Sequence, residues 1–410
     1  MGTAAKSIGM AASWHAPTRG ATIQTMSECS SLYVHVPFCQ SKCAYCDFNS
    51  YAGQEGLIPA YIDALGREAA HWAESGVDGR MKTLYFGGGT PTLLSIAEMA
   101  RLIDCVRQCF DVAEEAEVTA EANPETVDDV YLRELHRLGV NRLSIGVQSF
   151  DDADLRFLHR IHNAARAEDA YHAARDAGFD NVSIDLIFGL PGQATTSWRR
   201  TLEKATTLGP DHLSLYALTL EAGTPLAGRI AAGECPELDD DAQADMYTWS
   251  TKRLAEADYE QYEISNWSRS GHRCRHNLTY WRCESYLGLG AGAHSYVGGR
   301  RWANVRMPAE YIRLVAAAQP SPPAPPWVES SEEPDVDREL SDAIILGLRL
   351  SEGVSIEALD RRLGVDIGER YRREIDELGV LGLLESVDGR VRLTERGRLL
   401  GNEAFQRFLP

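Results

Sequence analysis

The amino-acid sequence predicts an α/β fold: a partial (β/α)6 TIM-like barrel, followed by a small C-terminal winged-helix-like α+β domain. Three observations lead to this prediction. Six short β-type runs alternate with helical patterns, polar residues gather where those runs end, and a proline-rich segment separates the last part of the chain. A chain of 410 residues is long enough for about two or three domains of ordinary size.

The first segment, residues 1–30, is rich in Ala, Ser, Thr and Gly and shows no hydrophobic periodicity. It contains no continuous apolar core of the kind that a signal peptide needs. We expect a disordered N-terminal extension here, with a weak transit peptide as the alternative.

Residues 31–318 show the alternation of strands and helices from which the barrel is predicted. The β-type runs are Leu32–Val36, Thr83–Phe86, Glu117–Glu121, Arg142–Val147, Asn181–Ile187 and His212–Leu218. The amphipathic stretches between them include Pro59–Ala73, Ile96–Phe110, Asp128–Leu138, Ala167–Ala177 and Ser197–Leu208. This alternation predicts βαβ units and a parallel sheet, which leaves a partial barrel and a doubly wound sheet as candidates.

The positions of the polar residues favour the barrel over the doubly wound sheet. The run Gly87–Thr90 and the side chains of Glu121, Gln148 and Asp185 all fall at or just past the end of a predicted strand. In a β/α barrel, these carboxyl ends of the strands converge on one active-site mouth. The sequence therefore predicts a barrel with a site at its mouth.

The last part of the chain follows residues 319–335, where six prolines predict an extended linker without helix or strand. In residues 336–410, three helical patterns, two short strands around a Val-Asp-Gly turn and a last helix predict the winged-helix-like domain. Such a domain raises DNA binding as a rival function. Its expected recognition helix, Ile367–Leu378, carries more acidic than basic residues and would be repelled by phosphate, so we expect a lid or docking module.

Composition and charge exclude several classes of function. With 41 basic and 60 acidic residues, the chain has a net charge of −19 and no general attraction for nucleic acid or anionic lipid. No apolar run approaches the ~20 residues of a membrane span. Nine cysteines are too few for a disulfide scaffold, and three of them fall within eight residues. We expect a cytoplasmic, metal-containing protein without a nucleic-acid partner.

The strongest signal is the segment Cys39-Gln-Ser-Lys-Cys43-Ala-Tyr-Cys46, which lies in the loop after the first strand. Three thiolates in one short loop can hold three corners of a four-iron cluster and leave one iron open to a small molecule. Structural zinc is the alternative, but zinc usually takes four ligands, and no second CxxC pair follows. The spacing favours a [4Fe-4S] cluster on Cys39, Cys43 and Cys46.

This motif, with Tyr45 before its last cysteine, resembles that of the radical S-adenosylmethionine (SAM) superfamily, and Phe86–Pro91 resembles the glycine motif of that superfamily. Four further segments narrow the resemblance to the oxygen-independent coproporphyrinogen III oxidase family, and within it to the HemW-type heme chaperones. They are Tyr33–Phe38, Ile145–Ser149, Asp185–Pro191 and His276–Trp281. The resemblance runs from about Tyr33 to the C-terminus and implies a radical SAM barrel.

The resemblance also implies roles for individual positions. In the superfamily, the open iron binds SAM, and an electron from the reduced cluster breaks a carbon–sulfur bond of SAM. The positions that match contacts to this cluster-bound SAM are Tyr33, Gly88, Glu121 and Ala217. The positions that match contacts to a second SAM in the oxidase are Tyr45, Gly89, Thr90, Gln148, Arg160 and Asp185.

One departure from the oxidase pattern separates the functions that the resemblance implies. The oxidase has a further cysteine two residues after the triplet, whereas here Cys46 is followed by Asp47 and Phe48. We therefore expect a heme chaperone that binds a [4Fe-4S] cluster, SAM and heme and transfers heme to an acceptor protein. The alternatives are an oxygen-independent coproporphyrinogen III oxidase of porphyrin biosynthesis and a DNA-binding regulator with a redox-sensing cluster. An electron donor such as a flavodoxin or ferredoxin is also implied, and a homodimer stays open.

The heme site is expected in the segment Arg273–Trp281, which puts His276 beside two arginines, an amide and two large aromatic residues. His276 would bind the iron axially, the arginines would face the propionates, and the aromatic rings would face the porphyrin. A histidine that is bonded within the core is the alternative. His294, just after the glycine-rich turn Gly288–Gly292, is the reserve ligand.

Overall fold

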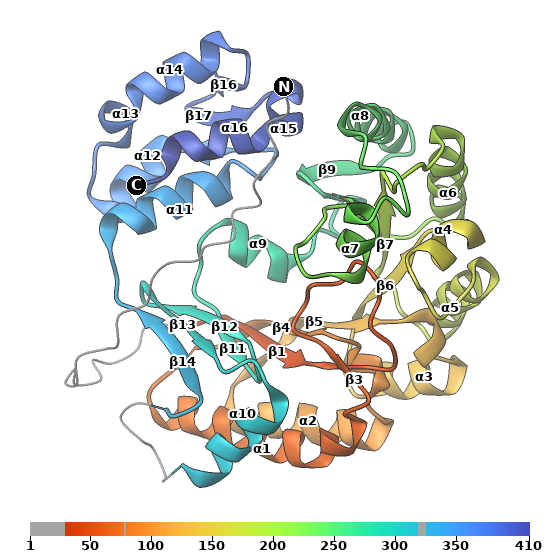
Figure 1. The fold of residues 1–410 in the computed structure, drawn as a ribbon. Helices are drawn as coiled ribbons and strands as arrows, with labels where there is room; N and C mark the ends of the chain where they lie inside the picture. Colours follow the sequence, from red (N-terminus) through yellow and green to blue (C-terminus); the bar gives the residue numbers. More distant parts are fainter. Residues whose placement is uncertain (1–28, 78, 319–324) are drawn as a thin grey trace.

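The structure is a computed structural model that describes residues 29–77, 79–318 and 325–410. Its centre is a curved, open sheet of nine strands in the order β11-β1-β4-β5-β6-β7-β8-β10-β9 (Figure 1). The six central strands are parallel: β1 (Ser31–Val36), β4 (Met81–Gly88), β5 (Val112–Ala122), β6 (Arg142–Gln148), β7 (Val182–Phe188) and β8 (His212–Ala217). They match the six expected runs and confirm the partial (β/α)6 barrel.

Three further strands, at the two edges of this sheet, lie outside the sequence prediction. β11 (Leu287–Leu289) runs parallel to β1, while β10 (Asn266–Ser268) and β9 (Glu260–Glu263) continue the other edge in antiparallel pairs. Each of these strands is only three or four residues long, so its sequence carries almost no periodicity. β11 pairs with β1 and β10 with β8, so these two strands can form only when β1 and β8 are already in place, and β9 pairs in turn with β10.

Helices cover the outer face of the sheet, as Figure 1 shows. They are α1 (Ile58–Glu74), α2 (Ile96–Cys109), α3 (Asp129–Arg137), α4 (Asp152–Phe157), α5 (Ala164–Asp176), α6 (Thr195–Leu208) and α8 (Asp240–Ala255). The short helix α7 (Pro225–Ala231) instead packs against the loop after β1, where the N–H of Leu226 donates to Ala44 O (2.9 Å). Polar caps set several of their starts: Ser95 and Glu98 form a capping box at α2, and Asp128 accepts a hydrogen bond from the N–H of Tyr131 at α3. The apolar faces of helices and strands share one continuous core.

A short helix, α9 (Arg275–Trp281), packs inside the barrel at the amino ends of the strands. Glu117 of β5 accepts hydrogen bonds from the backbone N–H groups of Arg275 (2.9 Å) and His276 (3.0 Å), so its carboxylate caps this helix. At the start of β1, the hydroxyl of Ser31 lies 2.9 Å from that of Thr279. We call α9 the barrel floor, and the mouth is at the opposite end.

The expected linker, residues 319–335, contains a strand, which corrects that expectation. β14 (Val328–Glu332) pairs with β13 (Arg300–Asn304), and β13 pairs with β12 (His294–Val297), which gives a second, three-stranded sheet. The prolines stand on both sides of β14 and none stands within it, so its N–H groups are able to pair. Residues 319–324 lie outside the described residues.

A buried carboxylate ties this second sheet to the barrel. Glu68 of α1 is fully buried and accepts hydrogen bonds from the N–H of Gly290 (2.7 Å), Asn304 Nδ2 (2.6 Å) and Trp327 Nε1 (3.1 Å). Tyr311 of α10 (Pro308–Ala317) donates a further one. The chain on both sides of residues 319–324 is therefore anchored to α1.

The elements of the C-terminal domain are α11 (Val336–Gly347), β15 (Val354–Ser355), α12 (Ile356–Leu363), α13 (Ile367–Arg370), α14 (Arg372–Val380), β16 (Leu384–Val387), β17 (Arg390–Leu393), α15 (Glu395–Leu399) and α16 (Gly401–Phe405). The domain has the expected helices followed by the expected pair of strands, with β15 as an additional strand and two short helices in place of the single last one. The single helix expected over Ile367–Leu378 is wrong, because the backbone of Tyr371 leaves the helical region (φ −112°, ψ 18°) and divides it into α13 and α14. The three strands form their own sheet.

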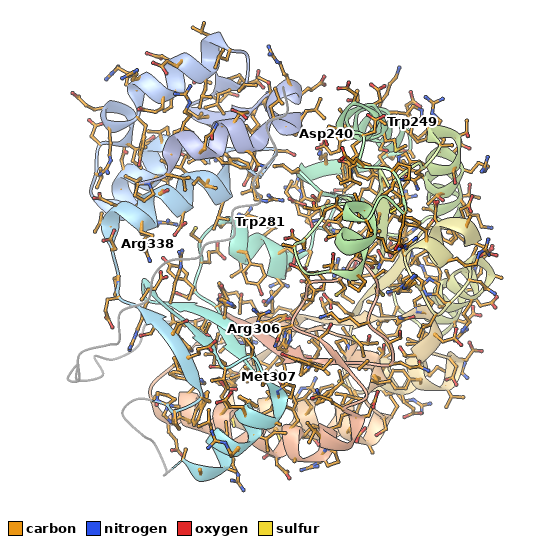
Figure 2. The ribbon with its side chains drawn as sticks, in the orientation of Figure 1. Asp240, Trp249, Trp281, Arg306, Met307 and Arg338 are labelled. Carbon is orange, nitrogen blue, oxygen red and sulfur yellow. The ribbon has the colours of Figure 1, made fainter. Side chains whose placement is uncertain are left out.

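The C-terminal domain is joined to the barrel beside β9 and α9. The backbone N–H of Ile264 donates to Arg349 O (3.1 Å), and that of Ser351 donates to Tyr262 O (3.0 Å). The Arg349 guanidinium lies 4.4 Å from the centre of the Trp281 ring on α9 (Figure 2). The barrel floor therefore forms part of the contact between the two domains.

Two remaining expectations concern the N-terminus and the membrane. Of the expected disordered extension, residues 1–30, the structure describes only Cys29 and Ser30, and Cys29 is buried in the core. None of the helices in the described parts of the chain combines the length and apolarity needed to cross a membrane.

Candidate functional site

Three cysteines lie in one loop that follows β1, between β2 (Phe38–Cys39) and β3 (Tyr51–Ala52). We call residues 39–50 the cluster loop. β2 and β3 pair with each other, so both ends of this loop are held. All three thiols are free, with Cys39 buried and Cys43 and Cys46 half-buried.

A polar side chain lies near each of the three sulfur atoms. The Thr90 hydroxyl donates to Cys39 Sγ (3.6 Å), and Arg160 Nη1 donates to Cys43 Sγ (3.3 Å). Ser50 Oγ lies 3.9 Å from Cys46 Sγ. Such donors are the groups that stabilise thiolate sulfur in iron–sulfur sites.

The donor set fits an iron–sulfur cluster. Burial raises the pKa of Cys39 and Cys46, although hydrogen bonds from neighbouring hydroxyls lower it in part, so these thiolates need positive charge nearby. Bound iron would supply that charge, with Arg160 beside it. Within the described ranges, no three His, Cys, Asp or Glu side chains gather closely enough to share a single metal ion. In a cubane cluster each thiolate instead binds a separate iron.

Asn49 clamps the end of the cluster loop to the edge of the barrel. Its Nδ2 donates to Ala291 O (2.9 Å) and Arg306 O (3.0 Å), and its backbone oxygen lies 2.8 Å from His35 Nε2. Lys42 Nζ closes the loop on itself by donating to two of its backbone oxygens, at 3.1 Å and 3.2 Å. Neither Asn49 nor His35 is among the candidates from the sequence, although His35 stands in the Tyr33–Phe38 motif.

The glycine run after β4 packs against the cluster loop. Gly88 has φ +116°, and a Cβ there would lie 2.5 Å from the His35 ring. A Cβ on Gly89 would lie 2.7 Å from a backbone oxygen of β2 and 3.0 Å from Cys39 Sγ. Only glycine fits at these two positions. The space that both glycines leave is thus filled by protein groups of the mouth.

Glu121, at the end of β5, turns its carboxylate toward the same run. It accepts hydrogen bonds from the Tyr85 hydroxyl (2.9 Å) and from the N–H of Gly88 (3.0 Å). Burial raises the pKa of Glu121 to about 7, more than these two hydrogen bonds lower it. A carboxylate so placed can accept further hydrogen bonds from hydroxyl or ammonium groups of a ligand.

Two further candidates lie on the next two strands, Gln148 on β6 and Asp185 on β7. Gln148 ends β6 with φ +67°, a conformation uncommon for a residue with a side chain. Asp185 of β7 accepts hydrogen bonds from the Ser144 hydroxyl, at 2.9 Å to the nearer oxygen, and burial raises its pKa. Arg160 Nη2 donates to Gly146 O (2.7 Å), while its Nε is buried without a partner in the described residues. Arg160 thus connects β6 to the cluster loop.

The remaining candidates are spread around the barrel. Tyr33 on β1 has its hydroxyl 2.9 Å from His35 Nδ1, and its ring stacks on that of Tyr85 with centres 6.1 Å apart. Tyr45 is half-buried in the cluster loop. Ala217 is exposed at the carboxyl end of β8, beside Tyr216, which is 43% exposed. Tyr216 is not among the candidates from the sequence; an aromatic residue at a strand end was its only signal.

His276 lies in the barrel floor, not at the mouth. It is buried, its Nδ1 lies 2.8 Å from the Thr83 hydroxyl, and its Nε2 lies 2.8 Å from the Tyr280 hydroxyl. Burial and the charge of Arg142 lower its pKa to about 3. Both ring nitrogens have a partner within the barrel floor, whereas an axial ligand of heme needs a free ring nitrogen, so heme ligation by His276 stays a prediction.

Comparisons with known protein families divide the chain in two. Residues 33–205 match the radical SAM superfamily, and residues 335–400 match the HemN C-terminal domain. The first match contains the cluster loop, the glycine run and the candidates from Tyr33 to Asp185. The second covers most of the C-terminal domain.

Relatives of similar length match nearly the whole chain. The protein named heme chaperone HemW of Bacillus subtilis is 35% identical, with 92% of this chain and 99% of that protein covered. Proteins of the same name from Mycobacterium tuberculosis and Escherichia coli are 38% and 35% identical, over 92% of this chain and 94% and 98% of theirs.

A solved structure resembles the fold over both domains. It is the coproporphyrinogen III oxidase HemN from Escherichia coli, described as a radical SAM enzyme. The two structures superpose with a TM-score of 0.80 and 25% sequence identity, and the match covers 94% of this chain and 91% of the oxidase. The partial barrel and the small C-terminal domain are therefore shared by an enzyme and by the chaperone-named relatives.

Proposed function

This chain belongs to the family of the heme chaperone HemW, within the radical SAM superfamily, and from that membership we propose that it is itself a heme chaperone. It binds a [4Fe-4S] cluster, SAM and heme, and it passes the heme to an acceptor protein. The observation that carries the proposal is the match over more than nine tenths of both chains to relatives of that name, with both domains included.

The cluster loop is the part of the chain that would hold the cluster. Cys39, Cys43 and Cys46 would each bind one iron, and the fourth iron would remain for SAM. Thr90 and Arg160 stabilise two of the thiolates through the hydrogen bonds described above. When bound and reduced, the cluster supplies the electron that breaks a carbon–sulfur bond of SAM.

The residues around the loop position SAM. Glu121 accepts hydrogen bonds from the ligand, and Gly88 holds that carboxylate in place through its N–H while leaving room for the His35 ring. Tyr33 and Ala217 face the same ligand from β1 and β8. Tyr33 reaches His35 and, through it, the backbone of the cluster loop, so SAM and the cluster are held by one connected set of groups.

The positions that match contacts to a second SAM in the oxidase mostly contact the cluster loop in this structure. Gly89 and Thr90 contact Cys39, and Arg160 contacts Cys43. Tyr45 belongs to the loop itself. Gln148 and Asp185 remain as contacts for a ligand at the ends of β6 and β7. We therefore propose one SAM site, with most of these side chains supporting the loop.

The second candidate function is that of the oxidase, which the structural match to HemN favours. Against it stand the chaperone-named relatives and Phe48, which replaces the further cysteine of the oxidase and is 66% exposed. An electron donor of the flavodoxin or ferredoxin class belongs to either function. All nine cysteines are free thiols, which supports a reducing compartment such as the cytoplasm.

Anaerobic reconstitution with iron and sulfide tests the cluster and the function together. We expect a brown protein with about four irons per chain, and we expect Cys39→Ala, Cys43→Ala or Cys46→Ala to lose that colour. Cys105→Ala, on the outer helix α2, is the matched control and should keep it. Stoichiometric zinc in place of iron and sulfide would contradict the cluster.

The reconstituted protein then separates chaperone from oxidase. We expect it to bind heme and to convert an apo-hemoprotein to its holo form, with no product from coproporphyrinogen III in the presence of SAM and reductant. Formation of protoporphyrinogen IX would assign the oxidase function instead.

A further inference from the structure

A histidine can bind heme iron only where a ring nitrogen is accessible, and most described histidines do not offer one. His35, His212 and His276 each have both ring nitrogens within hydrogen-bond distance of a partner in the barrel. His136 and His172 lie on the outer helices α3 and α5, away from the strand ends. His71 and His162 are buried, and His272 is half-buried just before α9. Two exposed histidines, His159 and His294, remain on loops that contact the cluster loop or its clamp.

His294 stands at the start of β12, just after the glycine turn that Asn49 clamps. Its side chain is exposed, and no described group hydrogen-bonds to its ring. Its backbone is fixed, because it pairs with Ala303 and its carbonyl packs on Gly288 of β11. A fixed backbone with a free imidazole is the arrangement that an axial ligand requires.

Two neighbouring residues suit the rest of a heme molecule. The Arg306 side chain is exposed, has no ion-pair partner in the described residues, and acts electrostatically on His294. Met307, which follows it before α10, is 46% exposed (Figure 2). A guanidinium can bind a propionate, and a thioether can pack against a porphyrin ring.

The cluster loop adds an aromatic side chain to the same place. Asn49 Nδ2 donates to Arg306 O (3.0 Å), so Phe48 and Met307 are each one residue from an end of that hydrogen bond. Both are exposed apolar side chains, 66% and 46% exposed, so each is available to pack against a flat apolar ligand.

His159 is less suited to the same task. It also has an exposed side chain, with φ +57°, and it follows Leu158, whose oxygen accepts from the N–H of Ala44. The adjacent cation, Arg160, is already bonded to Cys43 and to Gly146 and is not free for a propionate.

We propose that heme binds beside the cluster loop with His294 as an axial ligand of its iron, Arg306 on a propionate, and Phe48 and Met307 against the porphyrin ring. The proposal rests on the proposed function, because that function supplies heme as the ligand. It moves the heme from the barrel floor, where His276 lies, to the outer edge of the mouth.

Heme titration of the cluster-loaded full chain, followed by the Soret band, tests the site. We expect His294→Ala to weaken binding by roughly tenfold or more and to shift the Soret maximum. Added imidazole should restore the wild-type spectrum to His294→Ala, which a merely structural role would not predict. Arg306→Gln should weaken binding by a smaller factor without a spectral shift. His136→Ala is the control and should behave as wild type.

The outcomes separate this inference from the proposed function. If the wild type binds heme and His294→Ala binds it with the same affinity and spectrum, the inference is wrong and the chaperone function stands. If His159→Ala or His276→Phe weakens heme binding and changes the Soret maximum while His294→Ala does not, the axial ligand is that other histidine. If the wild type takes up no heme, the proposed function fails, and this site fails with it.

Discussion

At the scale of single residues, the mouth of the barrel holds one carboxyl group poised near neutral pH. Burial raises the pKa of Glu121 to about 7, so its two forms are both populated in the physiological range. In the folded protein this group binds its proton more tightly than in the unfolded chain. Its contribution to stability is therefore largest at low pH and is lost as the pH rises through about 7.

Binding of SAM should show the opposite dependence on pH. The ionised Glu121 is the form that accepts hydrogen bonds from SAM, so we expect affinity to fall as the pH drops below about 7, by up to about tenfold per unit. Equilibrium binding of SAM to the cluster-loaded protein between pH 6 and 8 measures this. Glu121→Gln should bind SAM more weakly and remove the step; an unchanged step in Glu121→Gln would assign it to another group.

Gly89 illustrates how a residue can match a ligand contact and still serve the protein. The family resemblance places it against SAM, while the structure places its missing Cβ against Cys39. We expect Gly89→Ala to destabilise the loop by about 1–3 kcal/mol and to reduce the iron content after reconstitution. Gly56→Ala, where a Cβ would meet nothing within 4 Å, is the control. If Gly89→Ala keeps its full iron content but binds SAM more weakly, Gly89 contacts SAM as the family resemblance implies.

At the scale of elements, the sequence predicts the long, regular parts and misses the short ones. The six parallel strands are buried on both sides, so their apolar runs are plain in the sequence. β14 was hidden by the prolines around it, and β11 by its length, since it consists of only three residues, Leu-Gly-Leu. Such strands form because a neighbouring edge is already present, and no local pattern reports that edge.

The capping of α9 by Glu117 gives a prediction at this scale. Its carboxylate satisfies two backbone N–H groups of the barrel floor, and both would be left without partners in Glu117→Ala. We expect a loss of about 1–3 kcal/mol in the free energy of unfolding, measured by urea denaturation. Glu115→Ala, on the same strand but exposed in a surface ion pair with Arg80, should cost less than about 1 kcal/mol. Equal losses would show that the cap contributes nothing beyond a surface contact.

At the scale of the whole molecule, an ion pair with a buried carboxylate joins the two domains. Glu263 of β9 is fully buried, and Arg349 of the C-terminal domain lies 3.5 Å from it while covering the Trp281 ring. Burial raises the pKa of Glu263, and Arg349 opposes that shift. The charge on one domain is therefore compensated by the other.

Removal of the cation should weaken the joint most at high pH. We expect Arg349→Met to lower the free energy of unfolding by about 3 kcal/mol at pH 8, because it leaves an ionised carboxylate buried alone. The loss should shrink at pH 5, because burial raises the pKa of Glu263 and removal of Arg349 takes away a charge that lowers it. Urea denaturation at both pH values measures this, and Glu263→Gln combined with Arg349→Met should recover part of the loss. A loss that does not vary with pH would mean that Arg349 acts through packing on Trp281.

The same scale explains which parts of the site the sequence could and could not predict. The polar residues at strand ends converge because barrel topology brings all such ends together, so Glu121, Gln148 and Asp185 were predictable from their positions alone. His276 was not, because the motif shows which groups are neighbours along α9 but not that this helix is enclosed by strands. Depth within a barrel depends on contacts between segments far apart in the chain.

The carboxylate of Glu68 has a consequence for where the chain can be opened. Because Tyr311 before residues 319–324 and Trp327 after them both donate to it, the backbone between these two points is not what keeps the C-terminal domain in place. A single protease cut there would leave two fragments that still migrate as one particle. New termini or an inserted reporter would be tolerated for the same reason, since each doubling of a loop costs only about 0.6 kcal/mol. For protein engineering, the two described sides of this stretch are thus held together by Glu68 itself.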